Sequence, residues 1–178
     1  YVRTGTPAFD ELIPRISRFL EQYLLELNID GEKIRGYRSP DARSVWIRNY
    51  SDMMRALRYT EADLNSVVRH FADNQSRNGR IFDYFTTFPE KMPCERENWT
   101  KYVRTPVEAD TEFRFIKAAW LAWQATGDDA FIRNLMPSFE RALTYVMEGR
   151  YFDREKYLFR RPYTIDTWDF AYTAGSHD

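Results

Sequence analysis

Three segments of the sequence combine carboxylates or amides, arginines and aromatic rings. They are residues 46–52, 80–110 and 160–170. Sugars need this mixture, because their flat C–H faces stack on rings while their hydroxyls require hydrogen-bond donors and acceptors. The three segments therefore predict a carbohydrate site. The candidates for contact with the substrate are Trp46, Arg48, Asn49, Asp52, Asp83, Tyr84, Glu108, Asp110 and Trp168.

Two further carboxylates are candidates for catalysis. Asp169 lies between Trp168 and Phe170, and apolar neighbours disfavour the ionised form of a carboxyl group. A raised pKa is what a general acid near neutral pH requires, so Asp169 is predicted to be the acid. Asp166 has the hydroxyl of Thr167 beside it, and we expect it to stay ionised and to hold a sugar hydroxyl or an arginine.

Several of these residues also fit structural roles. Asp52 fits a residue that caps or solvates a helix. Glu108 and Asp110 lie where they would compensate a helix dipole. Trp46 and Trp168 fit core packing as well as a sugar platform, and the sequence leaves these alternatives open.

The composition excludes several classes of function. The 178 residues include 26 basic and 27 acidic side chains, a balance that argues against a nucleic-acid partner or an anionic membrane. The longest apolar run, Ala118–Trp123, is too short to cross a bilayer. The single cysteine, Cys94, excludes an internal disulfide and a cysteine-based zinc site, and neither His70 nor His177 has a partner at metal-ligand spacing. We expect no metal and no cofactor, and the compartment stays open.

The spacing of apolar residues predicts five helices. They span Pro7–Asn28, Tyr50–Arg58, Thr60–Ser76, residues 105–126 and Asp129–Glu148. Trp120 and Trp123 are predicted to lie in the core. Residues 29–47 and 80–104 are predicted to be long irregular connections, and a short β-ribbon is expected around Tyr157–Tyr163.

Long and short connections alternate along this series. Helices alternate in direction, so the long connections should emerge at one end of the molecule, where the candidate site residues would gather. The pattern therefore predicts an all-α fold, an array of αα-hairpins with a site on one face. The alternative is a helical bundle whose loops happen to be long.

Three motifs resemble those of the six-hairpin glycosidases, and nearest the trehalases and processing α-glucosidases. They are Trp46–Met54, Val107–Glu112 and Thr164–Phe170. In trehalases a Gly-Trp-Asp-Phe-Ser stretch carries the general acid. Residues 167–171 resemble it at the central three positions, which implies that Asp169 is the acid. The sequence departs from the pattern with Thr167 for Gly, Ala171 for Ser, and Asn49 where an Arg-Asp pair is expected.

The resemblance implies a partial (α/α)6 toroid, with residues 1–178 as the N-terminal part of one catalytic domain. It implies an inverting glycoside hydrolase acting on an oligosaccharide or glycan, with the catalytic base on a later hairpin. Such chemistry needs two carboxyl groups about 6.5–9.5 Å apart. Since the resemblance puts the second of them outside this chain, we expect the chain alone to be inactive. The expected partners are a carbohydrate and the remainder of the domain. The alternatives are a polysaccharide lyase or a glycoside phosphorylase on a similar toroid, and a non-catalytic glycan-binding module.

Overall fold

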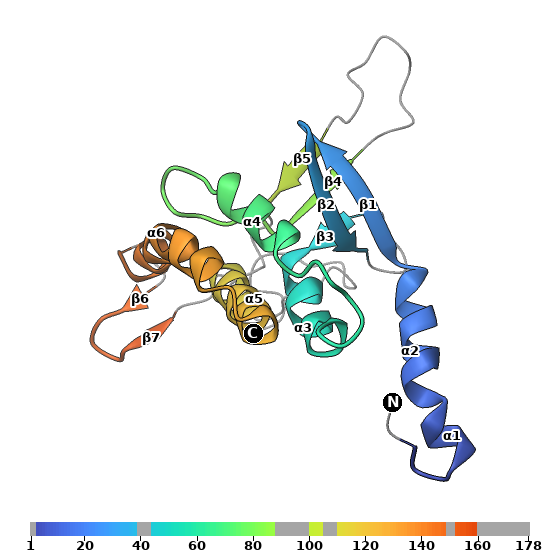
Figure 1. Ribbon diagram of the computed structural model, residues 1–178. Helices are drawn as coiled ribbons and strands as arrows, with labels where there is room; N and C mark the ends of the chain where they lie inside the picture. Colours follow the sequence, from blue (N-terminus) through green and yellow to red (C-terminus); the bar gives the residue numbers. More distant parts are fainter. Residues whose placement is uncertain (1–2, 39–43, 88–99, 105–109, 149–151, 160–178) are drawn as a thin grey trace, which may run out of the picture.

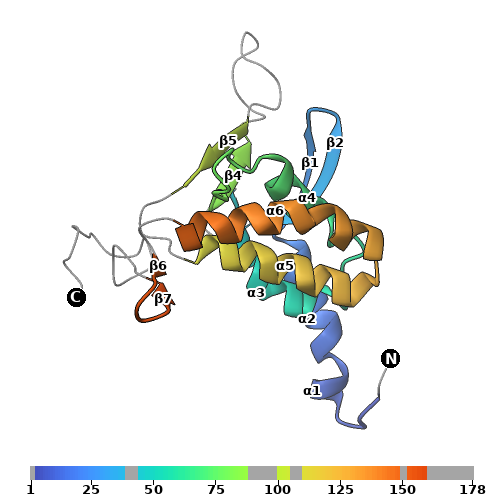
Figure 2. The ribbon, with the colours of Figure 1, turned by 90° about the vertical axis from the view of Figure 1, so that its left-hand side faces the viewer.

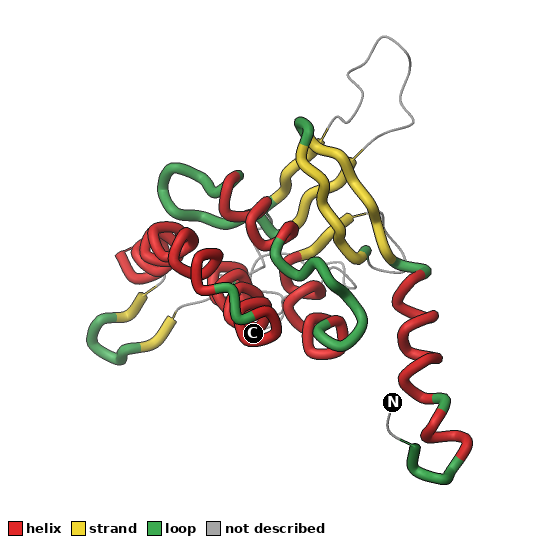
Figure 3. The backbone as a smooth tube through the Cα atoms, viewed as in Figure 1, coloured by secondary structure: helices red, strands yellow, loops and turns green. Residues whose placement is uncertain are grey.

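The structure, a computed structural model, describes residues 3–38, 44–87, 100–104, 110–148 and 152–159. Within these ranges helices are mixed with small antiparallel sheets (Figures 1 and 3). The predicted all-α fold, an αα-hairpin array forming part of an (α/α)6 toroid, is therefore wrong. The elements are α1 (Pro7–Asp10), α2 (Leu12–Glu21), β1 (Leu24–Ile29), β2 (Glu32–Tyr37), β3 (Ser44–Trp46), α3 (Ile47–Leu57), α4 (Ser66–Asp73), β4 (Tyr84–Thr87), β5 (Thr100–Val103), α5 (Thr111–Thr126), α6 (Asp129–Glu148), β6 (Phe152–Asp153) and β7 (Leu158–Phe159).

The predicted helix over Pro7–Asn28 ends at Glu21. After it, β1 and β2 form an antiparallel hairpin in which Ile29 pairs with Glu32. Asp30 and Gly31 make the turn, and both have positive φ, 51° and 88°. An Asp-Gly pair adopts this two-residue turn readily, because glycine tolerates positive φ and aspartate does so better than most residues. The Asp-Gly turn therefore favours a hairpin at this point, although the apolar spacing of β1 also fits the helix predicted over Pro7–Asn28.

The three-stranded sheet lies where the sequence predicts loops. Its strand order is β3–β4–β5, all antiparallel. Two backbone bonds extend the ladder beyond the strands: the Ile47 N–H donates to the Asp83 carbonyl at 2.9 Å, and the Asp83 N–H donates to the Val103 carbonyl at 2.8 Å. The sheet therefore leads the chain directly into α3.

Three helices of the body lie close to the sequence prediction. Helix α6 has the predicted bounds, α5 ends at the predicted Thr126, and α3 overlaps the predicted Tyr50–Arg58. Helix α5 packs against both α3 and α6 (Figure 2). The shorter α4 begins at Ser66 rather than Thr60, because the Asp63 carboxylate accepts the backbone N–H groups of Asn65 and Ser66 and so sets the start of the helix.

The two tryptophans of α5 differ from their predicted environment. Trp120 is 47% exposed, so the prediction that it lies in the core is wrong. Trp123 is partly buried, and its ring N–H donates to the Asp129 carboxylate. Alanines at 118, 119 and 122 occupy the buried positions beside them instead, and their small side chains allow close approach of the neighbouring helices.

The C-terminal ribbon forms slightly earlier than predicted. Strands β6 and β7 pair, with Phe152 opposite Phe159, whereas the prediction centred on Tyr157–Tyr163. Residues 160–163 lie outside the described part of the chain. Among the described helices, none combines the length and the apolar character needed to span a membrane.

Candidate functional site

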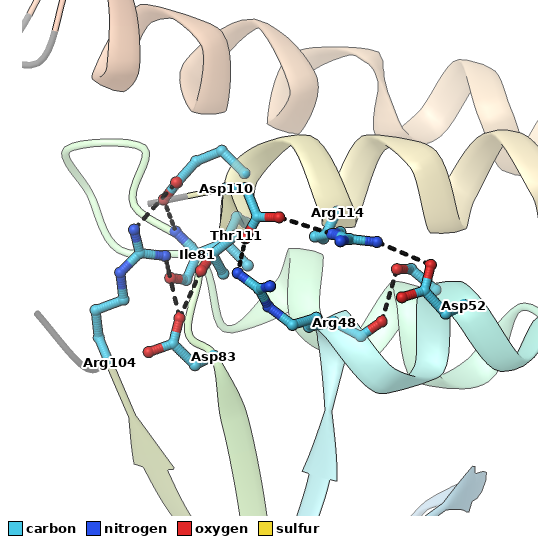
Figure 4. A network of polar contacts seen from close by, with 10 residues as sticks. Arg48, Asp52, Ile81, Asp83, Arg104, Asp110, Thr111 and Arg114 are labelled. Carbon is cyan, nitrogen blue, oxygen red and sulfur yellow. Dashed lines mark hydrogen bonds and ion pairs between the residues drawn. The ribbon is translucent and has the colours of Figure 1, made fainter. Parts of the chain in front are cut away.

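Three parts of the chain meet where α3 and α5 begin (Figure 4). The bond from Ile47 to Asp83 joins the start of α3 to the segment that precedes β4. The Thr111 hydroxyl, in the first turn of α5, donates to the Asp83 carboxylate at 2.6 Å. The segments of Arg48 and Asp83 therefore lie side by side, joined by the sheet and not by one end of the predicted αα-hairpin array.

A row of alternating charges links α3 and α5. We call Arg48, Asp110, Arg114, Asp52 and Lys117 the ion-pair row. Asp110 Oδ1 lies 2.5 Å from Arg48 Nη2, and Asp110 Oδ2 lies 2.8 Å from Arg114 Nε. Arg114 Nη1 continues to Asp52 Oδ1 at 2.8 Å, and Lys117 Nζ reaches the same oxygen at 2.7 Å. Since Arg48 meets Asp110 and Asp52 meets Arg114, the two helices run parallel, with both N-termini at this end.

The ion-pair row keeps its exposed carboxylate ionised. The Asp52 side chain is 54% exposed. Partial burial raises the pKa of Asp52, but the hydrogen bond from Lys117 and the charge of Arg114 outweigh that effect and bring the pKa below its ordinary value. Asp52 therefore presents a charged acceptor to solvent at neutral pH.

A second set of polar residues adjoins the row and is largely buried. We call Asp83, Arg104, Thr111 and Glu112 the buried network. Arg104 Nη1 donates to the Ile81 carbonyl at 3.0 Å and lies 3.4 Å from Asp83 Oδ1, while its Nη2 lies 3.2 Å from Glu112 Oε2. The other oxygen of Glu112 accepts the Ile81 N–H at 3.1 Å. The network thus fixes the start of α5 against the segment leading into β4.

Burial changes the electrostatics of this network. Glu112 is fully buried. Burial raises the pKa of Glu112, and the charge of Arg104 together with the Ile81 N–H opposes the rise only in part. A buried ion pair with several hydrogen bonds is costly to break, since either partner left alone would be an uncompensated charge. Glu112 and Arg104 therefore hold the site in shape, with Glu112 fully buried and the Arg104 side chain 11% exposed.

An aromatic pair flanks the same segments. Trp46 and Tyr84 are opposite each other in the β3–β4 register, with ring centroids 4.1 Å apart and ring planes tilted by 34°. Both side chains are half-buried. Trp46 lies two residues before Arg48, and Tyr84 follows Asp83 directly, so the two rings lie on the strands next to the polar segments along the chain.

The structure brings most of the predicted site residues together, with one change of role. Arg48, Asp52 and Asp110 belong to this region (Figure 4). Trp46 and Tyr84 pair on the adjoining strands β3 and β4, and Asn49 is exposed in the first turn of α3. Asp83 is only 2% exposed, so its position fits support for Thr111 and Arg104 rather than contact with a ligand. Glu108, Asp166, Trp168 and Asp169 lie outside the described residues.

Sequence reasoning missed the cations that complete the ion-pair row. Arg114 lies four residues after Asp110 and Lys117 three residues later, which places all three on one face of α5. That spacing is visible in the sequence and points to an ion-paired face. The role of Glu112 had no such signal, because its burial depends on Ile81 and Arg104, which come from other parts of the chain.

A metal site needs several ligand side chains close together. Among the described residues there is no cluster of three or more His, Cys, Asp or Glu side chains that could hold a metal ion. The expectation of a metal-free and cofactor-free site stays a prediction. What the site does offer is aromatic rings, ionised carboxylates and guanidinium donors in fixed positions.

No known family model, curated protein or solved structure matches this chain. The relation to the six-hairpin glycosidases therefore stays a prediction from the three sequence motifs.

Proposed function

We propose that the region formed by Trp46, Tyr84 and the ion-pair row binds a carbohydrate, and that the chain belongs to a glycoside hydrolase. The observation that carries the proposal is convergence. Residues from two of the three segments chosen from the sequence for their suitability to sugar binding, 46–52 and 80–110, lie around the starts of α3 and α5, and the third segment lies outside the described residues. Surface residues without a common role would not be expected to gather at one place in the fold.

The ion-pair row suits sugar hydroxyls for an electrostatic reason. Every carboxylate in the row already has a cationic partner. A sugar that covers the row therefore does not bury an uncompensated charge, which would be costly. Each hydroxyl can both donate to a carboxylate and accept from a guanidinium, so Asp52 and Arg48 supply complementary partners.

The catalytic assignment rests on sequence alone. Asp169 would donate a proton to the glycosidic oxygen as the bond to the anomeric carbon breaks. In an inverting reaction a second carboxylate activates a water molecule on the opposite face of the sugar. Asp166 would hold a sugar hydroxyl or an arginine close to the acid.

Calorimetric titration with neutral oligosaccharides tests the binding step. Aromatic contacts contribute about 0.5–1.5 kcal/mol beyond area burial, so Trp46→Ala should weaken binding by at least several-fold. Trp120→Ala is the matched control. Trp120 is also on the surface but lies ten residues along α5 from Asp110, or about 15 Å at ~1.5 Å per residue, and its loss should leave the affinity unchanged. Equal affinities of both variants would remove the sugar platform from the proposal.

Turnover of the full-length protein tests the catalytic step. A general acid contributes roughly 10²–10⁴-fold in rate, so Asp169→Asn should abolish hydrolysis of substrates with poor leaving groups and retain binding. Activated aryl glycosides need little protonation and should partly rescue that variant. Asp166→Asn should mainly raise KM. If neither variant loses more than tenfold in rate, the glycan-binding module without catalysis replaces the hydrolase.

A further inference from the structure

A cleft lies at the end of the helical body where α5 turns into α6 (Figure 2). Its volume is about 570 Å³, and it is lined by Arg58, Trp123, Gln124, Gly127 and Asp129. Arg58 follows the last residue of α3, and the other four belong to the last turn of α5, the turn itself and the start of α6. This volume is within the range of small-ligand sites in proteins.

The cleft is separate from the ion-pair row. Helices α3 and α5 run parallel, so the row begins at their N-terminal ends and the cleft lies at their C-terminal ends. Trp123 comes 13 residues after Asp110 and six after Lys117, or about 20 Å and about 9 Å along α5 at ~1.5 Å per residue. A molecule in the cleft therefore occupies a second site, which does not depend on the function proposed above.

Trp123 gives the cleft an aromatic ring whose orientation is fixed. The ring N–H donates to the Asp129 carboxylate across the turn, at 2.8 Å. This bond lies in the plane of the indole ring, so it holds the ring by its edge and does not cover its faces. The side chain is also partly buried. Since the ring is already ordered, a ligand that stacks on it loses little binding energy to further ordering.

Gly127 leaves open space beside that ring. It ends α5 in the left-handed conformation with φ 68°, and its N–H donates to the Trp123 carbonyl at 2.7 Å. A Cβ at this position would meet no other atom of the described chain within 4 Å. The turn therefore brings Trp123 and Asp129 together without filling the space between them and solvent.

The charges of the lining favour a neutral ligand. Arg58 carries one positive charge and Asp129 one negative charge, and both side chains are exposed. An anion would meet Asp129 and the negative ends of the α3 and α5 helix dipoles. A cation would meet the guanidinium of Arg58. A neutral polar ligand avoids both repulsions and can hydrogen-bond to both groups.

A sugar ring is a neutral polar ligand with a flat apolar face. Its C–H face can stack on Trp123, and its hydroxyls can accept from Arg58 and donate to Asp129. The Gln124 amide offers both a donor and an acceptor. A purely apolar ligand would instead leave these polar groups without partners, which is unfavourable.

We propose that the cleft at the turn between α5 and α6 is a second carbohydrate-binding site, in which a neutral sugar ring stacks on Trp123 and its hydroxyls bind the polar side chains that line the cleft.

NMR titration of the isotope-labelled full chain tests this site. The probes are maltotetraose, cellotetraose and mannotetraose. At least one of them should shift the resonances of the Trp123 indole N–H and the Gly127 amide until the site is saturated. The proposal is overturned if none of these sugars shifts them. It is also overturned if tetramethylammonium or inorganic phosphate shifts them and the sugars do not.

Variants show whether the aromatic ring binds the sugar. Trp123→Ala should weaken the affinity, followed at the Gly127 amide, by at least about fivefold, because the stacking surface is lost. Trp120→Ala is the matched control, since Trp120 is an exposed tryptophan one turn earlier on α5 and outside the cleft. It should bind like wild type. An equal loss in both variants would overturn the proposal. Trp46→Ala should also leave these shifts unchanged, so failure of this site and failure of the ion-pair row are separately visible.

A second pair of variants covers the case in which Trp123→Ala disturbs the fold through its lost bond to Asp129. Arg58→Ala changes an exposed side chain and should weaken binding by about threefold or more, because a charged donor is lost. Arg55→Ala is the control, an exposed arginine on α3 outside the cleft, and should bind like wild type. If Arg58→Ala binds as tightly as Arg55→Ala, the assignment of this cleft to a sugar is wrong.

Discussion

Asp110 at the start of α5 holds Arg48 of α3 at 2.5 Å through one carboxylate oxygen and Arg114 of its own helix through the other. One carboxylate thus joins the first turns of two parallel helices. The residues come from segments 62 positions apart in the chain. The Arg48–Asp110 contact requires α3 and α5 to be packed side by side, so its strength measures how well this part of the site is formed.

The Arg48–Asp110 pair should be worth more than an ordinary surface ion pair. The side chains are 25% and 33% exposed, so solvent screens them only in part. A double-mutant cycle with Arg48→Ala and Asp110→Ala, read by urea unfolding, should give a coupling of about 1 kcal/mol. The control cycle is Glu11 with Arg15, an exposed pair four residues apart, expected at about 0.3–0.5 kcal/mol. Equal couplings would show that the Arg48 contact is no better shielded than the control.

Glu112 should be the most sensitive carboxylate of the buried network. Glu112→Ala removes one of the two buried carboxylates beside the Arg104 guanidinium and leaves the Ile81 N–H without an acceptor, so we expect a loss of about 3–5 kcal/mol in the free energy of unfolding. Glu112→Gln keeps an oxygen for Ile81 and should lose less, about 1–3 kcal/mol. Glu140→Ala, an exposed change on α6, should stay within about 0.5 kcal/mol. Equal losses for the two Glu112 variants in denaturant titrations would contradict this account.

The sequence predicts the long helices better than the strands, for a physical reason. A helix such as α6 is held by local bonds and its spacing pattern extends over many residues, so the bounds Asp129 and Glu148 follow from local signals. Strand β3 has three residues, and its partners are far away, with Val45 opposite Phe85. No local pattern reveals such a pairing. The hairpin turn Asp30-Gly31 is the exception, because an Asp-Gly pair is a local signal for a two-residue turn.

Part of the site can be predicted from residue types, because several residues of types suited to sugars lie in segments that the fold brings into contact. Arg48 and Asp110 were identified by type, and they form a direct contact. Asp83 was identified by the same reasoning but is buried, since burial depends on Arg104 and Thr111 packing over it. Residue type thus indicates chemistry, while the surrounding elements decide whether a side chain contacts a ligand or supports one that does.

Gly79 should tolerate no side chain. It adopts φ +92°, and a Cβ there would lie 2.0 Å from the backbone carbonyl oxygen of Arg141 in α6. Gly79→Ala must therefore push the loop away from the helix, and thermal unfolding should show a large loss of stability. Gly127→Ala is the control, with φ +68° but open space around the Cβ. It should lose only the left-handed strain of about 1–2 kcal/mol. A loss at Gly79 no greater than that would mean that the contact with α6 relaxes freely.

The last prediction concerns pH and His70. This side chain is 3% exposed, its Nε2 lies 2.9 Å from the Tyr102 hydroxyl, and its ring lies edge-on to that of Phe85. Burial lowers the pKa of His70 below its ordinary 6.5, and the charges of Glu32 and Asp30 oppose this only in part.

The direction of the effect follows from proton uptake. In the unfolded chain His70 takes up a proton as pH falls through about 6.5, while in the folded chain it stays neutral to a lower pH. The unfolded state then binds more protons, so stability falls with decreasing pH, by at most about 1.4 kcal/mol per pH unit, until the folded pKa is reached. Above pH 7 this contribution to stability is fully present.

Urea titrations between pH 5 and 8 measure this loss. His70→Phe keeps an aromatic ring in the core and removes the titrating group, so its free energy of unfolding should fall less than that of wild type between pH 7 and pH 5. Tyr102→Phe removes the hydrogen bond to His70 and leaves the imidazole buried. Because burial is the main cause of the shift, that variant should keep the pH dependence of wild type. If Tyr102→Phe abolished the pH dependence, the Tyr102 hydroxyl and not burial would control the protonation of His70.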